Sequence, residues 1–142
     1  MIKERRFLFE ELDIREATFR YQFANNASGQ QQRAGSYYLA IPAGRKSGDP
    51  DDAFLKRFAG NKPPVKKQSD CDPSGEKGVV DKQTGERGVE FRTGKIKWVS
   101  DTEVQVSGGY YEAGESSSGN VYYLKKVNGK WTVTKDEMLL IS

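Results

Sequence analysis

The chain contains no histidine, and this absence removes several classes of chemistry at once. Histidine is the commonest general base in enzymes, and the serine and cysteine catalytic triads depend on it. Most zinc and iron sites need imidazole or several thiolates, and the chain has a single cysteine. The sequence therefore argues against hydrolases and metalloenzymes of these kinds, and it predicts neither a metal site nor a cofactor.

The single cysteine, Cys71, cannot form an internal disulfide, so the sequence neither requires nor forbids an oxidising compartment. Its neighbours include Asp70 and Asp72, and two carboxylates disfavour the thiolate that a nucleophile needs. We therefore interpret Cys71 as a structural or incidental residue.

Long apolar runs are also lacking, because no segment approaches the roughly 18 apolar residues of a membrane-spanning helix. Charges at positions 3–6 stand where the apolar part of a signal peptide would follow. We expect a soluble chain with no membrane span. Its compartment stays open: cytoplasmic, or secreted or periplasmic if a leader has been removed.

The charge balance and the glycine spacing do not favour nucleic-acid or nucleotide binding. The net charge of +3 arises from 23 basic and 20 acidic residues, which is too small and too mixed for a nucleic-acid footprint. Gly88 to Lys95 is the nearest approach to a phosphate loop, but its glycines are too far apart and no Ser or Thr follows the lysine. Asp81 to Glu86 resembles a calcium loop only loosely.

The length and the aromatic content of the chain are sufficient for one folded domain. Its 142 residues suffice for one core, and seven phenylalanines, seven tyrosines and two tryptophans supply large buried areas. We expect a single domain over residues 1–142.

Lys3 to about Asn25 contains no glycine or proline and predicts a long helix with two apolar faces. The first face carries Leu8, Leu12, Phe19 and Phe23, and the second carries Phe7, Ile14, Ala17 and Tyr21. Such a helix must be covered twice, by its own sheet and by a second element or subunit. A stop signal at 25–29 is expected to end it.

After the helix, Ser36 to Ile41 predicts a short strand near a sheet edge, ended by Pro42. Residues 49–60 then predict a short helix with Asp49 as its N-cap and a glycine at its end. This capping explains the local aspartates without a calcium ion.

Residues 61–88 contain many prolines and glycines, and we expect mostly loop with one short strand near Val79 and Val80.

The last third of the chain predicts a curved antiparallel meander. Residues 89–98 alternate around Gly94, which we interpret as a bulge, and the next strand, from Val104 to Tyr110, is kinked at its glycine pair. A polar connection is expected at 115–119, before the final hairpin.

The two-residue loop Asn128-Gly129 predicts a type I′ turn in the final hairpin. This register pairs Val127 with Lys130 and Lys126 with Trp131. Counting outward places one group of side chains on the inner wall: Tyr122, Leu124, Trp131 and Val133.

Carboxylates and tyrosines are the remaining candidates for chemistry. Glu90, Glu112 and Asp136 occupy alternating positions near strand ends, where a cavity carboxylate could act as an acid or base. The alternative is that they pair with lysines across the sheet. We take Glu90 as the candidate catalytic residue. In the two Tyr-Tyr pairs, one ring of each must face inward, where its hydroxyl can meet a ligand.

The order of elements, together with Gly129-Lys130-Trp131-Thr132-Val133 and Gly108-Gly109-Tyr110-Tyr111, resembles the nuclear transport factor 2-like (cystatin-like, polyketide-cyclase-like) superfamily. This resemblance implies an α+β fold in which a curved antiparallel sheet wraps the long N-terminal helix and leaves a cavity. Members are often dimers, and the family's enzymes commonly use an Asp/His or Asp/Tyr arrangement in the cavity. We expect a hydrophobic ligand pocket lined by Phe19, Phe23, Trp98, Tyr110, Tyr122 and Trp131.

Three functional hypotheses follow from these observations. The first is a noncatalytic small-molecule-binding or dimerisation module, bacterial in origin. The second is a lyase or isomerase that acts on a hydrophobic small molecule through a cavity carboxylate. The third is a secreted or periplasmic protein-interaction domain that meets its partner through the long segment at 61–88. We also expect a homodimer, because a helix with two apolar faces exposes more surface than one small subunit can cover.

Overall fold

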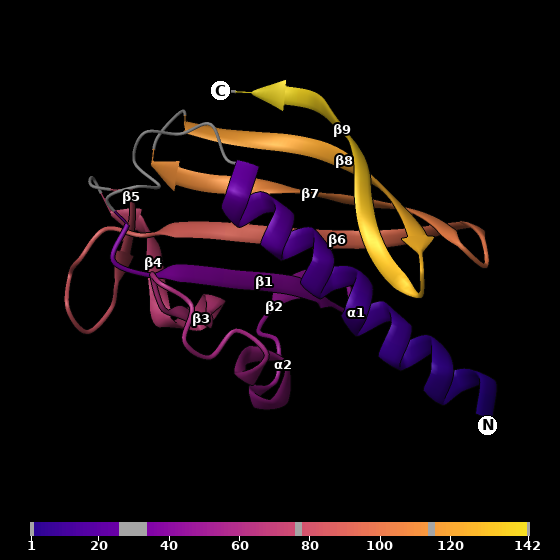
Figure 1. Ribbon diagram of the computed structural model, residues 1–142. Coiled ribbons are helices and arrows are strands. Elements are labelled where there is room, and N and C mark those ends of the chain that lie inside the picture. The colour runs from indigo at the N-terminus through magenta and orange to yellow at the C-terminus, as the bar shows by residue number, and fades with distance from the viewer. Residues whose placement is uncertain (1, 26–33, 76–77, 114–115, 142) are drawn as a thin grey trace.

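The computed structural model describes residues 2–25, 34–75, 78–113 and 116–141. They form an α+β fold in which one long helix, α1 (Ile2–Asn25), lies across a curved sheet (Figure 1). The predicted long helix is therefore confirmed. The stop signal expected after Asn25 falls on residues 26–29, which lie outside the described residues.

Seven described strands make one sheet, which is mostly antiparallel. Its order is β2 (Lys46–Gly48), β1 (Tyr37–Ala43), β6 (Val89–Ser100), β7 (Glu103–Ala113), β8 (Ser116–Val127) and β9 (Lys130–Ile141). The strand β3 (Val65–Lys67) also pairs with β1, and both the β1–β3 and β1–β6 pairings are parallel. The first strand lies near the sheet edge as predicted, with only the short β2 beyond it in this order, but it does not end at Pro42, which pairs with Ser47 inside β1.

The short second helix, α2 (Asp52–Lys56), begins two residues later than its sequence predicts. Its N-cap is Asp51, whose carboxylate accepts a hydrogen bond from the Phe54 amide at 2.8 Å. Asp49 does not cap the helix. Its carboxylate instead accepts hydrogen bonds from the amide and hydroxyl of Ser69, which tie the helix entry to the following segment.

Residues 61–88 are more regular than expected. Besides β3 they contain a 3₁₀ turn, η2 (Gln68–Asp70), and a hairpin formed by β4 (Cys71–Gly75) and β5 (Gly78–Asp81). The strand predicted near Val79 is confirmed as β5. This segment covers the sheet face opposite α1, where Cys71 and Val79 pack with Tyr38.

The meander follows its predicted register closely. The pairing of β6 with β7 shifts between Thr93 and Ile96, which confirms the bulge at Gly94. In the final turn Asn128 and Gly129 have φ angles of 51° and 79°, as a type I′ turn requires, and Lys126 faces Trp131. The predicted polar connection is too long, because β8 already begins at Ser116.

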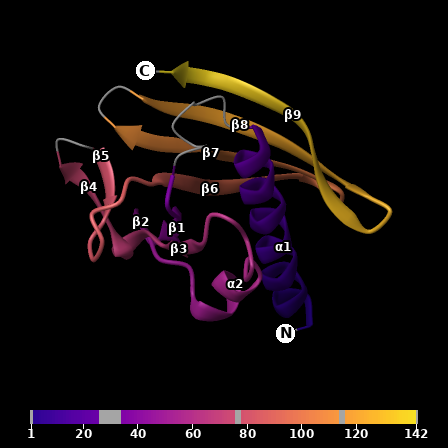
Figure 2. The same cartoon turned by 60° about the vertical axis from the view of Figure 1, so that its left-hand side comes forward.

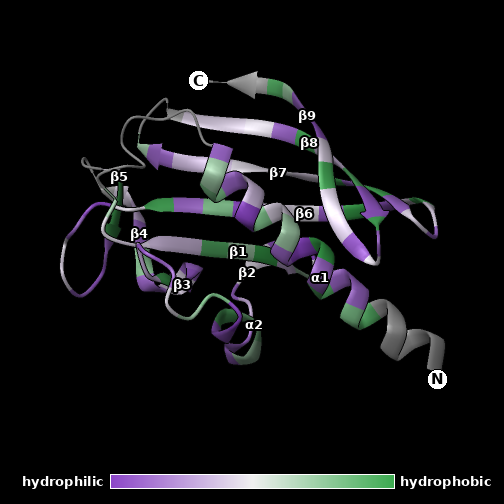
Figure 3. Cartoon of the chain, in the orientation of Figure 1, coloured by the Kyte–Doolittle hydropathy of each residue, from purple (hydrophilic) through white to green (hydrophobic). Residues whose placement is uncertain are grey.

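From Leu12 to Phe23, both apolar faces of α1 are covered by this chain itself. One face packs with β1, β6 and α2 in a cluster built on Phe19, Phe54 and Phe91. The other packs with β7, β8 and β9, because the β8–β9 hairpin curls across the helix (Figures 1 and 2). Figure 3 shows the corresponding alternation of hydrophobic and hydrophilic residues along α1. This part of the helix therefore needs no second subunit to cover it, whereas Leu8 of the first face stays 60% exposed.

Candidate functional site

The six aromatic residues expected to line one pocket are divided between the two clusters. Phe19 and Phe23 pack beside α2, with Tyr110 against the same cluster. Tyr122 and Trp131 are buried in the second cluster. Trp98, expected to line the pocket, belongs to neither cluster, and 36% of its surface is exposed. It lies near the end of β6 and contacts the edge of the Trp131 ring, with a centroid distance of 5.7 Å.

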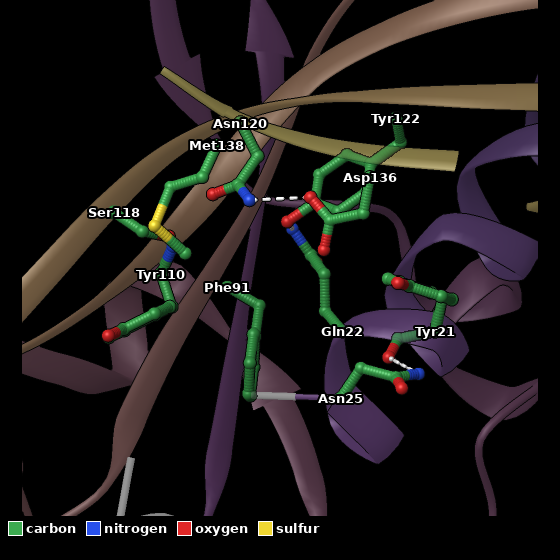
Figure 4. A pocket seen from close by; sticks show the side chains of 10 residues that line it. All are labelled: Tyr21, Gln22, Asn25, Phe91, Tyr110, Ser118, Asn120, Tyr122, Asp136 and Met138. Carbon is green, nitrogen blue, oxygen red and sulfur yellow. Dashed lines mark hydrogen bonds between the residues drawn. The ribbon is translucent and has the colours of Figure 1, made fainter. Parts of the chain in front are cut away.

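A pocket opens between the last turns of α1 and the strands β6–β9 (Figure 4). It has a volume of about 50 Å³, far below the roughly 300–1,000 Å³ of sites for drug-sized ligands. Two of the six predicted aromatic residues, Tyr110 and Tyr122, belong to it. The lining consists of Tyr21, Gln22, Asn25, Phe91, Tyr110, Ser118, Asn120, Tyr122, Asp136 and Met138.

Gln22 reaches from α1 into the sheet and is 4% exposed. Its Nε2 donates to the carbonyl oxygens of Arg92 at 2.9 Å and Gly109 at 3.3 Å, and to the Tyr122 hydroxyl at 3.2 Å. Two carbonyls can only accept, so they fix the orientation of the amide. Its Oε1 is buried and has no hydrogen-bond partner among the described residues.

Asn120 in β8 provides a second buried amide, 5% exposed. Its Nδ2 donates to Asp136 Oδ1 of β9 at 2.6 Å, as Figure 4 shows. The carboxylate can only accept this bond, so the Asn120 Oδ1 must point away from it. Within the described part of the chain this buried oxygen also lacks a partner.

Two tyrosine hydroxyls stand close to the same carboxylate. Burial raises the pKa of Tyr21, and the neighbouring Asp136 raises it further. Burial likewise raises the pKa of Tyr122 to about 12, so this hydroxyl stays protonated at neutral pH. The pocket thus presents two amide oxygens and a carboxylate beside neutral phenols and the Phe91 ring.

Close approach of the strands is needed to bring these groups together. A Cβ atom on Gly108 would lie 3.2 Å from Gln22 Nε2 and would collide with the Arg92 carbonyl oxygen. Gly109 has a φ of 156°, and a Cβ atom there would collide with the Ser118 carbonyl. The glycine pair that the sequence marks as a kink therefore also makes room for the Gln22 amide.

The candidate Glu90 lies elsewhere. It pairs with Tyr38 and Tyr111, on the sheet face opposite α1, whereas its neighbour Phe91 faces the helix. Burial raises the pKa of Glu90, and Arg92 and Gln68 partly oppose this shift. Glu90 is therefore not beside Tyr110 or Tyr122. Of the other two carboxylates, Glu112 is buried in β7 and Asp136 reaches the pocket.

Comparison with family models, with curated proteins and with solved structures finds no significant match for this chain. Among the described residues there is no cluster of three or more side chains suited to holding a metal ion. No helix in the described ranges is long and apolar enough to cross a membrane. Any function must therefore be argued from the geometry of the chain.

A wider groove of about 720 Å³ runs between α1 and the start of β9. The charges on its α1 wall are paired, since Arg57 Nη1 lies 2.8 Å from Asp13 and 3.1 Å from Glu16, and Arg20 lies 2.9 Å from Glu16. Among the described residues the groove contains one buried polar atom without a partner, Trp131 Nε1, whereas the smaller pocket is lined by two residues with such atoms, Gln22 and Asn120, and is therefore the stronger candidate.

Sequence reasoning missed Gln22 and Asn120. Gln22 lies between the two apolar faces of α1, where a polar residue is expected to meet solvent. Asn120 follows a serine-rich stretch that suggests a loop. The only available sequence signal was the glycine pair at 108–109, which indicates a backbone approached closely by another group.

Proposed function

We propose that this chain is a noncatalytic binding module that takes a small molecule, or part of one, into the pocket between α1 and β6–β9. The observation that carries this proposal is the pair of buried amide oxygens on Gln22 and Asn120. Each has an orientation fixed by its own nitrogen, and neither has a partner among the described residues.

A buried polar atom without a partner costs about 1–3 kcal/mol. A folded chain tolerates two such atoms in one place when a ligand or an ordered water satisfies them. The pocket opens to solvent beside exposed Asn25, Asp136 and Met138, so a ligand can enter without unfolding of the chain.

The fold supports kinship with the nuclear transport factor 2-like superfamily as part of this proposal. A long N-terminal helix packs on a mostly antiparallel sheet whose last hairpin curls across it. The parallel pairing of β1 with β6 and the β4–β5 hairpin are the features that a relative would have to share.

The alternative of a lyase or isomerase has one observation in its favour. Asp136 and the hydroxyl of Tyr122 line the same pocket, so a carboxylate and a hydrogen-bond donor could act on one substrate. Against this, one oxygen of Asp136 is already engaged by Asn120, and a volume of about 50 Å³ excludes a steroid-sized molecule. The noncatalytic proposal therefore takes precedence.

Homodimerisation is a further candidate role, favoured by the apolar residues that stay exposed near the start of α1. Leu8 and Phe9 are 60% and 64% exposed, on a helix end that projects beyond the sheet (Figure 1). Burying such side chains against a second copy would be favourable by about 25 cal/mol per Å².

A fragment screen read by NMR tests the proposal of a binding module. Small neutral, anionic and cationic fragments are added, and the side-chain amide resonances of Gln22 and Asn120 are followed. We expect at least one class to shift both pairs saturably, and Asn120→Ala to abolish the effect. Gln105→Ala, in β7 outside the pocket, is the matched control. If no fragment class moves either pair of resonances, the proposal fails.

A further inference from the structure

The pocket is lined by hydroxyls and amides that can donate as well as accept, but the two buried lining atoms without a partner among the described residues are both acceptors, and this selects the chemistry of a ligand. These atoms are Gln22 Oε1 and Asn120 Oδ1, which belong to residues that line the pocket, and Asp136 adds a carboxylate to the same lining. A partner must therefore bring several N–H donors, and a positive charge would complement the carboxylate. We propose, as a refinement that rests on the proposed function, that this pocket holds the ammonium group of a primary amine.

The walls suit a small cation. The rings of Phe91, Tyr110 and Tyr122 line the same pocket, and an aromatic face within about 6 Å attracts a positive charge. Primary alkylamines are protonated at neutral pH, as the lysine side chain is, with a pKa of about 10.4. An ammonium group offers three donors, which matches two amide oxygens and one carboxylate.

The volume restricts what enters. About 50 Å³ accommodates an ammonium group with one or two carbons, so the remainder of the ligand must stay outside. The mouth formed by Asn25, Asp136 and Met138 is exposed and leaves room for it. The pocket is thus a head-group site that can serve a free amine or a lysine side chain of a peptide.

Two nearby basic residues, Arg92 and Lys135, each have a carboxylate partner of their own. The Arg92 guanidinium extends toward Glu90, 4.0 Å away, and toward the Ser118 carbonyl at 3.5 Å. Lys135 lies 3.7 Å from Glu137 and 5.1 Å above the Tyr123 ring. Both positive charges are therefore engaged by other groups.

Matched ligands separate this inference from simpler explanations. Butylammonium is the probe, 1-butanol is its neutral counterpart, and tetramethylammonium carries a charge but no N–H donor. We expect butylammonium to shift the Gln22 and Asn120 amide resonances saturably, and butanol to bind at least roughly tenfold more weakly. Tetramethylammonium should also fail, because it is bulky and cannot donate to the amide oxygens. If tetramethylammonium binds as tightly as butylammonium, the amide oxygens do not recognise the ligand. The pocket then binds cations through its aromatic rings alone, and the inference is wrong.

A second arm identifies the source of the amine. Nα-acetyl-lysine methylamide presents the same ammonium group on a peptide-like frame. Binding at least as tight as that of butylammonium assigns the pocket to a lysine side chain, and clearly weaker binding assigns it to a free amine.

Variants complete the test. Asp136 is exposed, so Asp136→Asn should fold normally while weakening butylammonium binding by roughly tenfold or more. Asp101→Asn, in the exposed turn between β6 and β7, is the matched control and should bind as wild type. Equal affinity in wild type and Asp136→Asn overturns the inference. If neutral or anionic fragments shift the Gln22 and Asn120 resonances and amines do not, the ligand is not an amine. The proposal of a small-molecule-binding module is then still supported. If no fragment and no amine shifts these resonances, an ordered water fills the pocket, and both the amine inference and the proposed binding function are wrong.

Discussion

The guanidinium of Arg15, in the middle of α1, donates a hydrogen bond to the Gly94 carbonyl of β6 at 2.8 Å. The same Nη1 donates to the Thr93 hydroxyl at 3.0 Å. Both acceptors lie where the pairing of β6 with β7 is interrupted, so the helix supplies a donor at the bulge of the sheet. This contact fixes the position of α1 along the sheet and therefore the place where Gln22 of α1 meets the strands of the pocket.

Replacing Arg15 by methionine should lower the free energy of unfolding by about 2–4 kcal/mol, because two buried acceptors would lose their donor. Urea denaturation at neutral pH measures the loss. Lys125→Met is the matched control, because Lys125 is exposed and lies 3.8 Å from Glu103, and such surface pairs contribute about 1 kcal/mol or less. Equal losses for the two variants would contradict the structural role of Arg15.

Trp131→Ala should cost roughly 3–5 kcal/mol, because the side chain is buried against Ile14, Val104 and Leu124. Trp98→Ala should cost clearly less, since Trp98 is partly exposed. Urea melts of both variants give the comparison. A loss below about 1 kcal/mol for Trp131→Ala would mean that the inner face of the final hairpin is wrongly assigned.

The stability of the chain should fall on acidification because of Asp81. Hydrogen bonds from Lys66 and then from the Tyr38 hydroxyl, together with the backbone amides of Gln83 and Thr84, hold the pKa of this carboxyl well below its usual range. The unfolded value is about 3.9, so the stabilisation is present above that pH and is lost as the pH falls toward the lowered folded value.

Unfolding free energies at a series of pH values test this dependence. At pH 7 the unfolding free energy of wild type should exceed that of Asp81→Asn. This difference in unfolding free energy should become smaller below about pH 4. Asp101→Asn, at an exposed turn, should show no such gap. A gap between wild type and Asp81→Asn that stays constant down to pH 3 would count against the proposed network.

Glu90 should show the opposite pH dependence. Burial raises its pKa above the unfolded value of about 4.3, so its contribution to stability is lost as the pH rises through the folded value. Glu90→Gln should therefore gain stability relative to wild type at higher pH.

Because Glu90 lies on the sheet face opposite α1, the variant should bind every pocket ligand as wild type does. NMR titration of the glutamate carboxyls tests the raised pKa of Glu90. A ligand screen on wild type and Glu90→Gln tests whether binding is unchanged.

A homodimer, if formed, should depend on the exposed start of α1. We expect light scattering over a concentration series to show a dimer for wild type, and Phe9→Glu to weaken it by placing a charge in the interface. Lys125→Glu, on an exposed position of β8, is the control. A monomeric mass at roughly tens of micromolar protein would rule out an obligate dimer.

Elements with local determinants were predictable from the sequence. The final hairpin follows from Asn128-Gly129, because this pair adopts the two positive φ angles of a type I′ turn and thereby fixes the strand register. The bulge at Gly94 follows from the change in alternation along one strand. Each of these signals lies within about ten residues of the feature that it specifies.

Elements held by distant contacts were not predictable. The segment at 61–88 is organised by Asp81, which binds Lys66 and, 43 positions away, the Tyr38 hydroxyl. The pocket depends on Gln22 meeting Tyr122, 100 positions along the chain. Alternation along one strand cannot show which polar side chain of another element will lie above it, so Gln22 and Asn120 carried no local signal.

The packing of apolar clusters on two faces of α1 also determines how the chain unfolds. The helix forms one wall of both apolar clusters, so neither cluster can keep its interior dry once α1 has left. The region beside α2 and the region beside the β8–β9 hairpin should therefore lose their native structure together. Amide hydrogens in β1 and in β8 should then exchange with solvent through one shared opening event, with the same free energy, rather than through two independent ones.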